Sequence, residues 1–218
     1  MIKMIGKIFI VGIGPGGGEY LTVKALDTVE KCDYTVGSVR AVELFENVRN
    51  PISFTVKDLV ETLEKGVELA AEGNNVAVLS TGDPGFSGVL NTVLRLSGEM
   101  NFPYDNIEVI PGISSLQLAA ARNHIQWDNA NVMTFHGREN VEDILDVIDN
   151  GRITIALPSR KVKDMAQFLL DNGVDPNRHV TVCERLSYPD EKIVSTSLKS
   201  VATSEFTYMC IIIIESKN

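Results

Sequence analysis

Three short segments rich in glycine or serine have the composition of loops that bind a small molecule through the backbone. They are residues 12–16 (GIGPG), 81–85 (TGDPG) and 111–115 (PGISS). Each follows a run of aliphatic and β-branched residues that is typical of a buried strand. If the strands are parallel, all three loops lie at the carboxyl edge of one sheet, where open α/β folds bind their ligands. Together they predict a binding site, although each alone is also typical of an ordinary strand-to-helix turn.

The first loop raises the alternative of a dinucleotide site. It matches the pattern Gly-x-Gly-x-x-Gly at Gly12, Gly14 and Gly17. A dinucleotide site needs backbone amides at a helix start within the glycines. Pro15 removes one of these amides, and the following helix is predicted to begin only after Thr22, its N-cap. The second predicted strand also has its acidic residue, Asp33, at the beginning instead of the end, where a ribose would need it. A nicotinamide-dependent oxidoreductase is therefore the weaker alternative, and the absence of Gly-Lys-Ser/Thr excludes a P-loop.

Composition and charge exclude several classes of protein. The chain has 218 residues, of which 44% are hydrophobic and 22% charged, as in ordinary globular proteins. Its 20 basic and 29 acidic residues give a net charge of −9, which disfavours nucleic acids and anionic membranes as partners. The three cysteines lie far apart and predict neither a disulfide framework nor a metal site. No apolar run approaches the roughly 20 residues of a membrane span, and we expect a cytoplasmic protein.

The sequence pattern predicts an α/β fold with two α/β domains, residues 1–125 and 126–218. In the first, strand-like runs alternate with helical periodicity, which indicates an open and mainly parallel sheet. These runs are residues 7–11, 33–36, 76–81 and 107–110. A polar stretch at residues 122–130 is the predicted boundary. The second domain begins with the same alternation, including a helix over residues 141–148, but no convincing helix separates its last two strands at 192–195 and 208–214. It should therefore have a mixed sheet.

Taken in order, the motifs resemble those of the tetrapyrrole methylase family. They are residues 11–16 (VGIGPG) with 21–25 (LTVKA), 82–84 (GDP) with 87–88 (SG), and 111–115 (PGISS). The family comprises S-adenosylmethionine-dependent methyltransferases of corrin and sirohaem synthesis, together with diphthine synthase, and the resemblance covers essentially the whole chain. Residues 136–138 (HGR) and 184–191 (ERLSYPDE) most resemble the members that methylate cobalt-precorrin-7 at C5 in anaerobic cobalamin synthesis. The resemblance implies two α/β domains with the cofactor in the cleft between them.

The resemblance also implies which residues contact S-adenosylmethionine and its product S-adenosylhomocysteine. In the predicted first domain they are Pro15, Gly82, Asp83, Phe86, Ser114 and Ser115, and in the second they are Leu157 and Leu186. The carboxylate of Asp83 can accept from an ammonium group or from ribose hydroxyls. Two alternatives stay open: Asp83 can instead bond to local turn amides, and the two leucines can be ordinary core residues.

The acceptor implied by the resemblance is a polycarboxylate corrinoid, which calls for basic side chains. Arg138, Arg185 and Tyr188 are the predicted substrate-binding residues, although each arginine could equally be a solvated surface charge. His136, at a strand end beside Gly137, is the candidate for acid–base work or substrate contact, with a turn-capping histidine as the alternative. No catalytic triad is expected, because methyl transfer needs mainly alignment of the reacting atoms.

The resemblance implies partners as well. We expect a homodimer, and a separate enzyme for the methylation at C15 with decarboxylation that some relatives carry as a fused domain. Two rival functions stay open: another member of the family, acting at a different macrocycle position or on diphthine, and a regulatory module that binds an adenosyl ligand without turnover.

Overall fold

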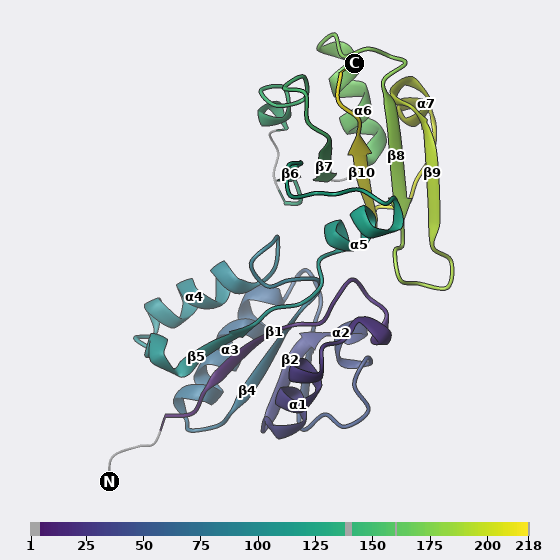
Figure 1. The fold of residues 1–218 in the computed structure, drawn as a ribbon. Helices are drawn as coiled ribbons and strands as arrows, with labels where there is room; N and C mark the ends of the chain where they lie inside the picture. The colour runs from purple at the N-terminus through teal and green to yellow at the C-terminus, as the bar shows by residue number, and fades with distance from the viewer. Residues whose placement is uncertain (1–4, 138–140, 160, 218) are drawn as a thin grey trace. The chain divides into compact units, whose positions relative to one another are not determined.

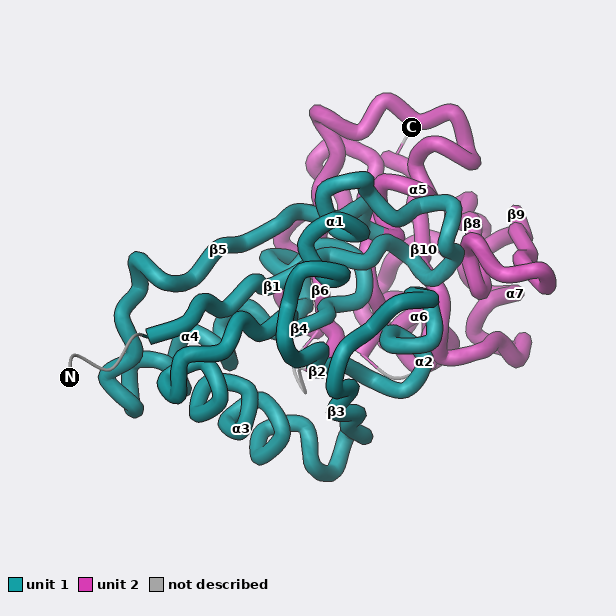
Figure 2. Tube along the Cα trace, turned by 90° about the horizontal axis from the view of Figure 1, so that it is seen from below, with its two compact units in different colours: residues 1–114 teal, residues 115–218 magenta. Residues whose placement is uncertain are grey.

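The computed structural model describes residues 5–137, 141–159 and 161–217. It divides into two compact units, Met1–Ser114 and Ser115–Asn218, coloured teal and magenta in Figure 2. The division falls before helix α5 (Ser115–Arg122), whereas the sequence placed the boundary in the polar stretch after it. Helix α5 contacts strands of the second sheet, and its apolar residues Leu116, Leu118 and Ala119 are buried. These contacts group the helix with residues that follow it in the chain.

The first unit contains a five-stranded sheet in the order β3-β2-β4-β1-β5, with parallel pairing between neighbours (Figure 1). Its strands are β1 (Ile8–Gly12), β2 (Tyr34–Ser38), β3 (Pro51–Phe54), β4 (Val76–Ser80) and β5 (Ile107–Ile110). Its helices are α1 (Val23–Lys31), α2 (Val39–Val42), α3 (Leu59–Ala71) and α4 (Leu90–Glu99), with short 3-10 turns η1 (Gly18–Tyr20) and η2 (Tyr104–Asn106). This confirms the predicted parallel α/β architecture.

Alternation along the strands sends apolar side chains to both faces of this sheet. Ile8, Ile10 and Val78 share a buried cluster with residues of α3 and α4. Val11 and Leu79 point the other way and share a cluster with residues of α1 and α2. Sequence signals fix the start of α1 as predicted, because the Thr22 hydroxyl accepts a 3.1 Å hydrogen bond from the backbone N–H of Ala25. Helices on both faces leave the carboxyl edge of the sheet to the loops.

The second unit contains a mixed five-stranded sheet in the order β6-β7-β10-β8-β9, as predicted. The pair β6–β7 is parallel and the other pairs are antiparallel. The strands are β6 (Asn131–Thr134), β7 (Thr154–Leu157), β8 (His179–Glu184), β9 (Lys192–Ser197) and β10 (Cys210–Ile214). Besides α5, the unit contains α6 (Val162–Asp171), α7 (Leu198–Thr203) and the 3-10 turn η3 (Glu142–Ile144).

Two local predictions for this unit were wrong. The helix expected over residues 141–148 is only the short turn η3, although Ile144 and Ile148 are buried as a helical face would be. Conversely, α7 does lie between β9 and β10, where no helix was expected. It is six residues long, too short for its periodicity to stand out, and it is held by packing of Leu198 and Val201 in the core.

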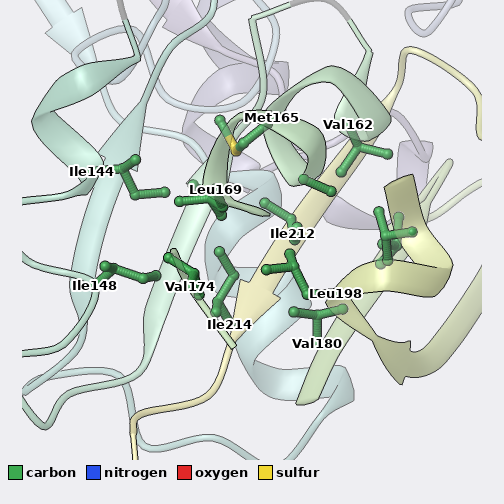
Figure 3. Close-up of a cluster of buried hydrophobic side chains, with 14 of the residues drawn as sticks. Ile144, Ile148, Val162, Met165, Leu169, Val174, Val180, Leu198, Ile212 and Ile214 are labelled. Carbon is green, nitrogen blue, oxygen red and sulfur yellow. The ribbon is translucent and has the colours of Figure 1, made fainter. Parts of the chain in front are cut away.

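The core of the second unit lies between one face of the sheet and helices α6 and α7. Figure 3 shows side chains of β10, including Ile212 and Ile214, near Leu169 and Met165 of α6. All five residues of β10 are buried, because this strand is central in the sheet and pairs with both β7 and β8. The aliphatic run near the C-terminus is therefore a core strand. Within the described residues, no helix combines the length and apolarity that crossing a bilayer requires.

Candidate functional site

The three predicted loops follow β1, β4 and β5, which are neighbours in the parallel sheet. Gly12 of β1 pairs with Ser80 of β4, and Val11 pairs with Ile110 of β5, so the strands end at nearly the same level. The expectation that the loops share the carboxyl edge of one sheet is confirmed (Figure 1). This is the position at which open α/β sheets place their ligand sites.

The loops are joined to one another by their backbones. The N–H of Gly14 donates to the carbonyl of Gly82 at 3.3 Å, and the N–H of Gly82 donates back to the carbonyl of Gly14 at 2.7 Å. A Cβ atom added at Gly12 would lie 2.4 Å from the amide nitrogen of Gly112, and one added at Gly112 would lie 2.3 Å from the carbonyl oxygen of Gly82. Glycine is required at 12 and 112 because no side chain fits between the loops.

The turn at Gly82 leaves space beside its Cα, whereas the backbone is tightly packed at Gly12 and Gly112. Gly82 has a φ of 70°, in the left-handed region that favours glycine. A Cβ added there would meet only the Cα of Ser114, at 3.8 Å. The second loop therefore has a glycine that is needed for its conformation and that, although buried, has room beside its Cα where Gly12 and Gly112 have none.

Asp83 links the second loop to the third. One carboxylate oxygen, Oδ1, accepts from the N–H of Gly85 at 2.8 Å, and the other, Oδ2, accepts from the N–H of Gly112 at 3.1 Å. The alternative that Asp83 bonds to turn amides is therefore realised, and it extends to a neighbouring loop. A carboxylate oxygen can accept more than one hydrogen bond, so these contacts leave Asp83 able to accept from a ligand as well.

The other predicted cofactor residues divide between the two units. Pro15 is buried in the first loop, and Phe86 is half-buried, with its N–H donating to the carbonyl of Asp83 at 3.2 Å. Ser114 is the last residue of the first unit, and Ser115 begins α5 in the second. The structure thus gathers Pro15, Gly82, Asp83, Phe86 and Ser114 at one sheet edge.

Leu157 and Leu186 lie in the second unit. Leu157 is half-buried and ends β7, paired with Thr134 of β6. Leu186 is buried in the loop between β8 and β9, and it is not among the described residues of the core cluster in Figure 3. Burial outside the main core makes Leu186 a stronger ligand-contact candidate than a leucine within it.

Arg185 and Tyr188, both predicted to bind the substrate, contact each other in the same loop. The guanidinium of Arg185 lies 4.6 Å from the centroid of the Tyr188 ring, a cation–π distance. The Nε of Arg185 also donates to Oδ1 of Asp190 at 2.7 Å. The hydrogen bond with Asp190 raises the pKa of Arg185, and the same bond lowers the pKa of Asp190. Nη1 of Arg185 lies 3.9 Å from the sulfur of Met209, a weak acceptor. Arg185 is therefore held in place, and a fork of this shape can still bind a carboxylate through its remaining N–H groups.

His136 is exposed and follows β6 after the buried Phe135. Its backbone N–H donates to the hydroxyl of Thr134 at 3.3 Å, whereas its imidazole makes no hydrogen bond to any residue that the structure describes. Beside it, Gly137 has a φ of 72° and no atom within 4 Å of an added Cβ. The third predicted substrate residue, Arg138, lies outside the described residues.

One residue that the sequence did not single out organises the loop carrying Leu186. Glu191 accepts from Nε of Arg122 at 2.8 Å through one carboxylate oxygen and from the N–H of Ser187 at 2.8 Å through the other. The hydrogen bond from Arg122 lowers the pKa of Glu191, with a further contribution from the Ser187 amide and partial burial acting in the opposite direction. Glu191 ends the segment 184–191 that carried the resemblance, but its partner lies far away in the sequence.

The described residues contain no group of three or more His, Cys, Asp or Glu side chains arranged to hold a metal ion. All three cysteines are buried thiols, and burial raises the pKa of Cys183 to about 11 and that of Cys210 to about 12. A cavity of about 290 Å³ lies in the first unit near Leu21 and Phe45, but it contains none of the predicted site residues. Its carboxylates, Glu30 and Glu46, would repel a polycarboxylate substrate.

Comparison with known proteins gives consistent results. The model of the family Tetrapyrrole (Corrin/Porphyrin) Methylases matches residues 7–202. A probable cobalt-precorrin-7 C(5)-methyltransferase of Methanocaldococcus jannaschii is 41% identical over 210 residues, which cover 95% of this chain and 97% of that protein.

Solved structures share the fold over nearly the whole chain. A precorrin-6Y methylase of cobalamin biosynthesis from Archaeoglobus fulgidus has a TM-score of 0.67 and 27% identity, covering 97% of this chain and 99% of that one. Uroporphyrin-III C-methyl transferase from Thermus thermophilus, complexed with S-adenyl homocysteine, has a TM-score of 0.74 at 23% identity, covering 96% and 92%. The joined glycine loops, the two sheets and the match over residues 7–202 lead to one conclusion: this chain belongs to the tetrapyrrole methylase family.

Proposed function

We propose that this methyltransferase transfers a methyl group from S-adenosylmethionine to C5 of cobalt-precorrin-7 in the anaerobic route of cobalamin synthesis. The observation that carries the proposal is that three loops are joined at one edge of the first sheet. The relative from M. jannaschii, which is similar to this chain in length and sequence, has this activity in its name. Which carbon of the macrocycle receives the methyl group depends on contacts to the substrate, and an assay with the acceptor distinguishes the possible positions.

The hydrogen-bonding groups at the loop edge fit an adenosyl amino acid. Such a ligand presents an ammonium group, a carboxylate, ribose hydroxyls and an adenine ring, and it needs both donors and acceptors. The loop edge offers the carboxylate of Asp83, the hydroxyl of Ser114, and the backbone of the open Gly82 turn, with Pro15 and Phe86 as apolar neighbours. From the second unit we propose further contacts to the cofactor. These are Ser115, Leu157 and Leu186.

The chemistry asks the protein for alignment more than for acid or base. When bound, S-adenosylmethionine would supply a methyl group carried on a sulfonium, and the neutral thioether of S-adenosylhomocysteine would be the leaving group of an in-line displacement. The chain's own task is to hold the two reactants in line and to exclude water, which can supply most of the acceleration. We propose that Arg185 and Tyr188, together with Arg138, bind carboxylates of the substrate. His136 is proposed either to contact the substrate or to accept, at a ring nitrogen of its imidazole, a proton that the substrate loses.

Three expectations about assembly and location stay predictions. We propose a homodimer, a cytoplasmic location in keeping with the three buried thiols, and a separate enzyme for the C15 step. A polycarboxylate corrinoid is the proposed partner at the acceptor side.

Calorimetric titration tests the cofactor directly. We expect saturable binding of S-adenosylhomocysteine, with a Kd in the micromolar range, and no binding of NAD or NADP. Consumption of cobalt-precorrin-7 with S-adenosylmethionine, and a methyl group at C5 of the product by NMR, would then establish the reaction. Binding of a nicotinamide ligand instead would show that the Gly12–Gly17 pattern is a dinucleotide fingerprint. Binding without turnover of any corrinoid would support the regulatory alternative.

Replacing His136 with alanine separates cofactor binding from turnover. The imidazole of His136 is exposed and makes no hydrogen bond to the residues that the structure describes. His136→Ala should therefore leave the Kd for S-adenosylhomocysteine unchanged. The turnover number should fall about 100-fold, the lower end of what a positioned proton-transfer group contributes. His179→Ala is the matched control, since His179 is also exposed but pairs with Glu215 at 3.2 Å. Equal turnover in the two variants would remove His136 from the mechanism.

A further inference from the structure

The loop that carries Leu186 has a backbone that only strong local contacts can hold. Arg185 and Ser187, on either side of Leu186, have φ values of 45° and 69°. Both are in the left-handed region, which is unfavourable for residues other than glycine and persists where surrounding contacts enforce it. The N–H of Arg185 donates to the carbonyl of Met209 at 2.9 Å, and the N–H of Tyr188 donates to the carbonyl of Arg185 at 3.0 Å. These bonds fix the two ends of the turn.

Glu191 contacts the middle of the turn. Its Oε2 accepts from the N–H of Ser187 at 2.8 Å, and its own N–H donates to the carbonyl of Tyr188 at 2.9 Å. Its Oε1 accepts from Nε of Arg122 at 2.8 Å. Only 21% of the Glu191 side chain is exposed, so solvent replaces these contacts poorly. One carboxylate thus connects the strained residue after Leu186 to a distant part of the chain.

That distant part is the C-terminal end of helix α5. Arg122 is the last residue of the helix. The first residue of the helix is Ser115, a proposed cofactor contact that also ends the third loop. The next residue, Asn123, donates through Nδ2 to the carbonyl of Ala119 at 2.8 Å and lies 3.3 Å from the sulfur of Cys183 in β8. The helix end is therefore fastened to the strand that leads into the Leu186 loop. Two proposed cofactor contacts, Ser115 and Leu186, lie on one braced assembly.

We propose that Glu191 is a positioning residue for Leu186: by bridging Arg122 and the amide of Ser187, it holds the Leu186 side chain in the orientation that the adenosyl ligand requires. The inference rests on the proposed function, since it takes Leu186 as a contact to the cofactor. Without the carboxylate, the hydrogen bond from the amide of Ser187 to Oε2 of Glu191 is lost, and with it one of the contacts that hold the left-handed turn, so the Leu186 side chain can adopt other orientations.

A double-mutant cycle tests this proposal on the full chain. The variants are Glu191→Ala, Leu186→Ala and the double variant, each titrated with S-adenosylhomocysteine. We expect Glu191→Ala to raise the Kd about tenfold, as the loss of a partly buried hydrogen-bonded charge would. In the Leu186→Ala background the same change should have almost no further effect, because the side chain that Glu191 positions is gone. An equal loss in both backgrounds would overturn the proposal and make Glu191 a general structural residue.

Controls separate this outcome from unfolding and from failure of the proposed function. Glu215→Ala removes another carboxylate, which pairs with His179 in β8, and should leave the Kd unchanged. Glu191→Gln retains an oxygen for the Ser187 amide and is the variant to use if Glu191→Ala does not fold; its loss should be smaller and should again vanish without Leu186. If the parent protein does not bind the ligand, the proposed function fails. If the parent binds and Glu191→Ala binds equally well, only the positioning role fails.

Discussion

Replacing Gly112 with alanine should destabilise the first unit by about 3 kcal/mol and raise the Kd for S-adenosylhomocysteine by tenfold or more. The added Cβ would lie 2.3 Å from the carbonyl oxygen of Gly82 and 2.7 Å from the carbonyl carbon of Gly12. Both atoms belong to backbone, which cannot move aside as a flexible side chain can. Overpacking of a closed contact commonly costs about 1–3 kcal/mol, and a clash with two backbones belongs at the upper end.

The effect on binding follows from the way the loops are joined. Relieving the clash means moving the third loop away from the first two, which breaks the hydrogen bond between the N–H of Gly112 and Asp83. The same movement displaces Ser114, whose Cα borders the open Gly82 turn. Denaturant unfolding without ligand measures the first effect, and calorimetric titration measures the second.

The 3-10 turn η1, which follows the first loop, provides a matched control for this substitution. Gly18 has no atom within 4 Å of an added Cβ and no φ in the left-handed region, so Gly18→Ala should change neither stability nor affinity beyond about 0.5 kcal/mol. If Gly112→Ala unfolds at the same denaturant concentration as Gly18→Ala, the loops are not joined as the structure has them.

These glycines show where sequence reasoning succeeded and where it lacked information. The motifs located the loops, and the strand pattern put them at one edge, because parallel strands of similar length end together. The reason assigned to the glycines was close approach to a ligand. For Gly12 and Gly112 the reason in the structure is close approach of loop to loop, which depends on strand order and register that composition does not encode.

The second unit shows a related limit. Periodicity predicted a helix over residues 141–148, but the chain there forms only a 3-10 turn that still buries Ile144 and Ile148. An apolar residue every few positions satisfies the core in either conformation, so the pattern alone does not decide between them. The bridge from Arg122 to Glu191 was missed for another reason: it joins residues that are adjacent only in the folded chain. Long-range partners of this kind need the structure.

The second large effect is expected at Asp83, where the structure changes the reason for the prediction. As a direct ligand of the cofactor, Asp83 would affect binding and leave the free protein unchanged. As a link between loops, it affects both, because Asp83→Ala leaves the amides of Gly85 and Gly112 without their acceptor. We therefore expect a loss of about 2 kcal/mol in the free energy of unfolding without ligand, together with a roughly tenfold rise in the Kd for S-adenosylhomocysteine.

Two further variants decide between the roles of Asp83. Asp83→Asn keeps the shape and one carbonyl oxygen, but it turns an N–H donor toward one of the two amides, so its stability loss should lie between those of the parent and the alanine variant. Asp27→Ala, at an exposed position on α1, is the control for removing a carboxylate from the same unit and should be nearly neutral. A variant Asp83→Ala that unfolds like the parent but binds tenfold more weakly would assign Asp83 to the ligand alone. Loss of both properties would mean that the carboxylate shapes the site by holding the second and third loops together, whether or not it also contacts the ligand.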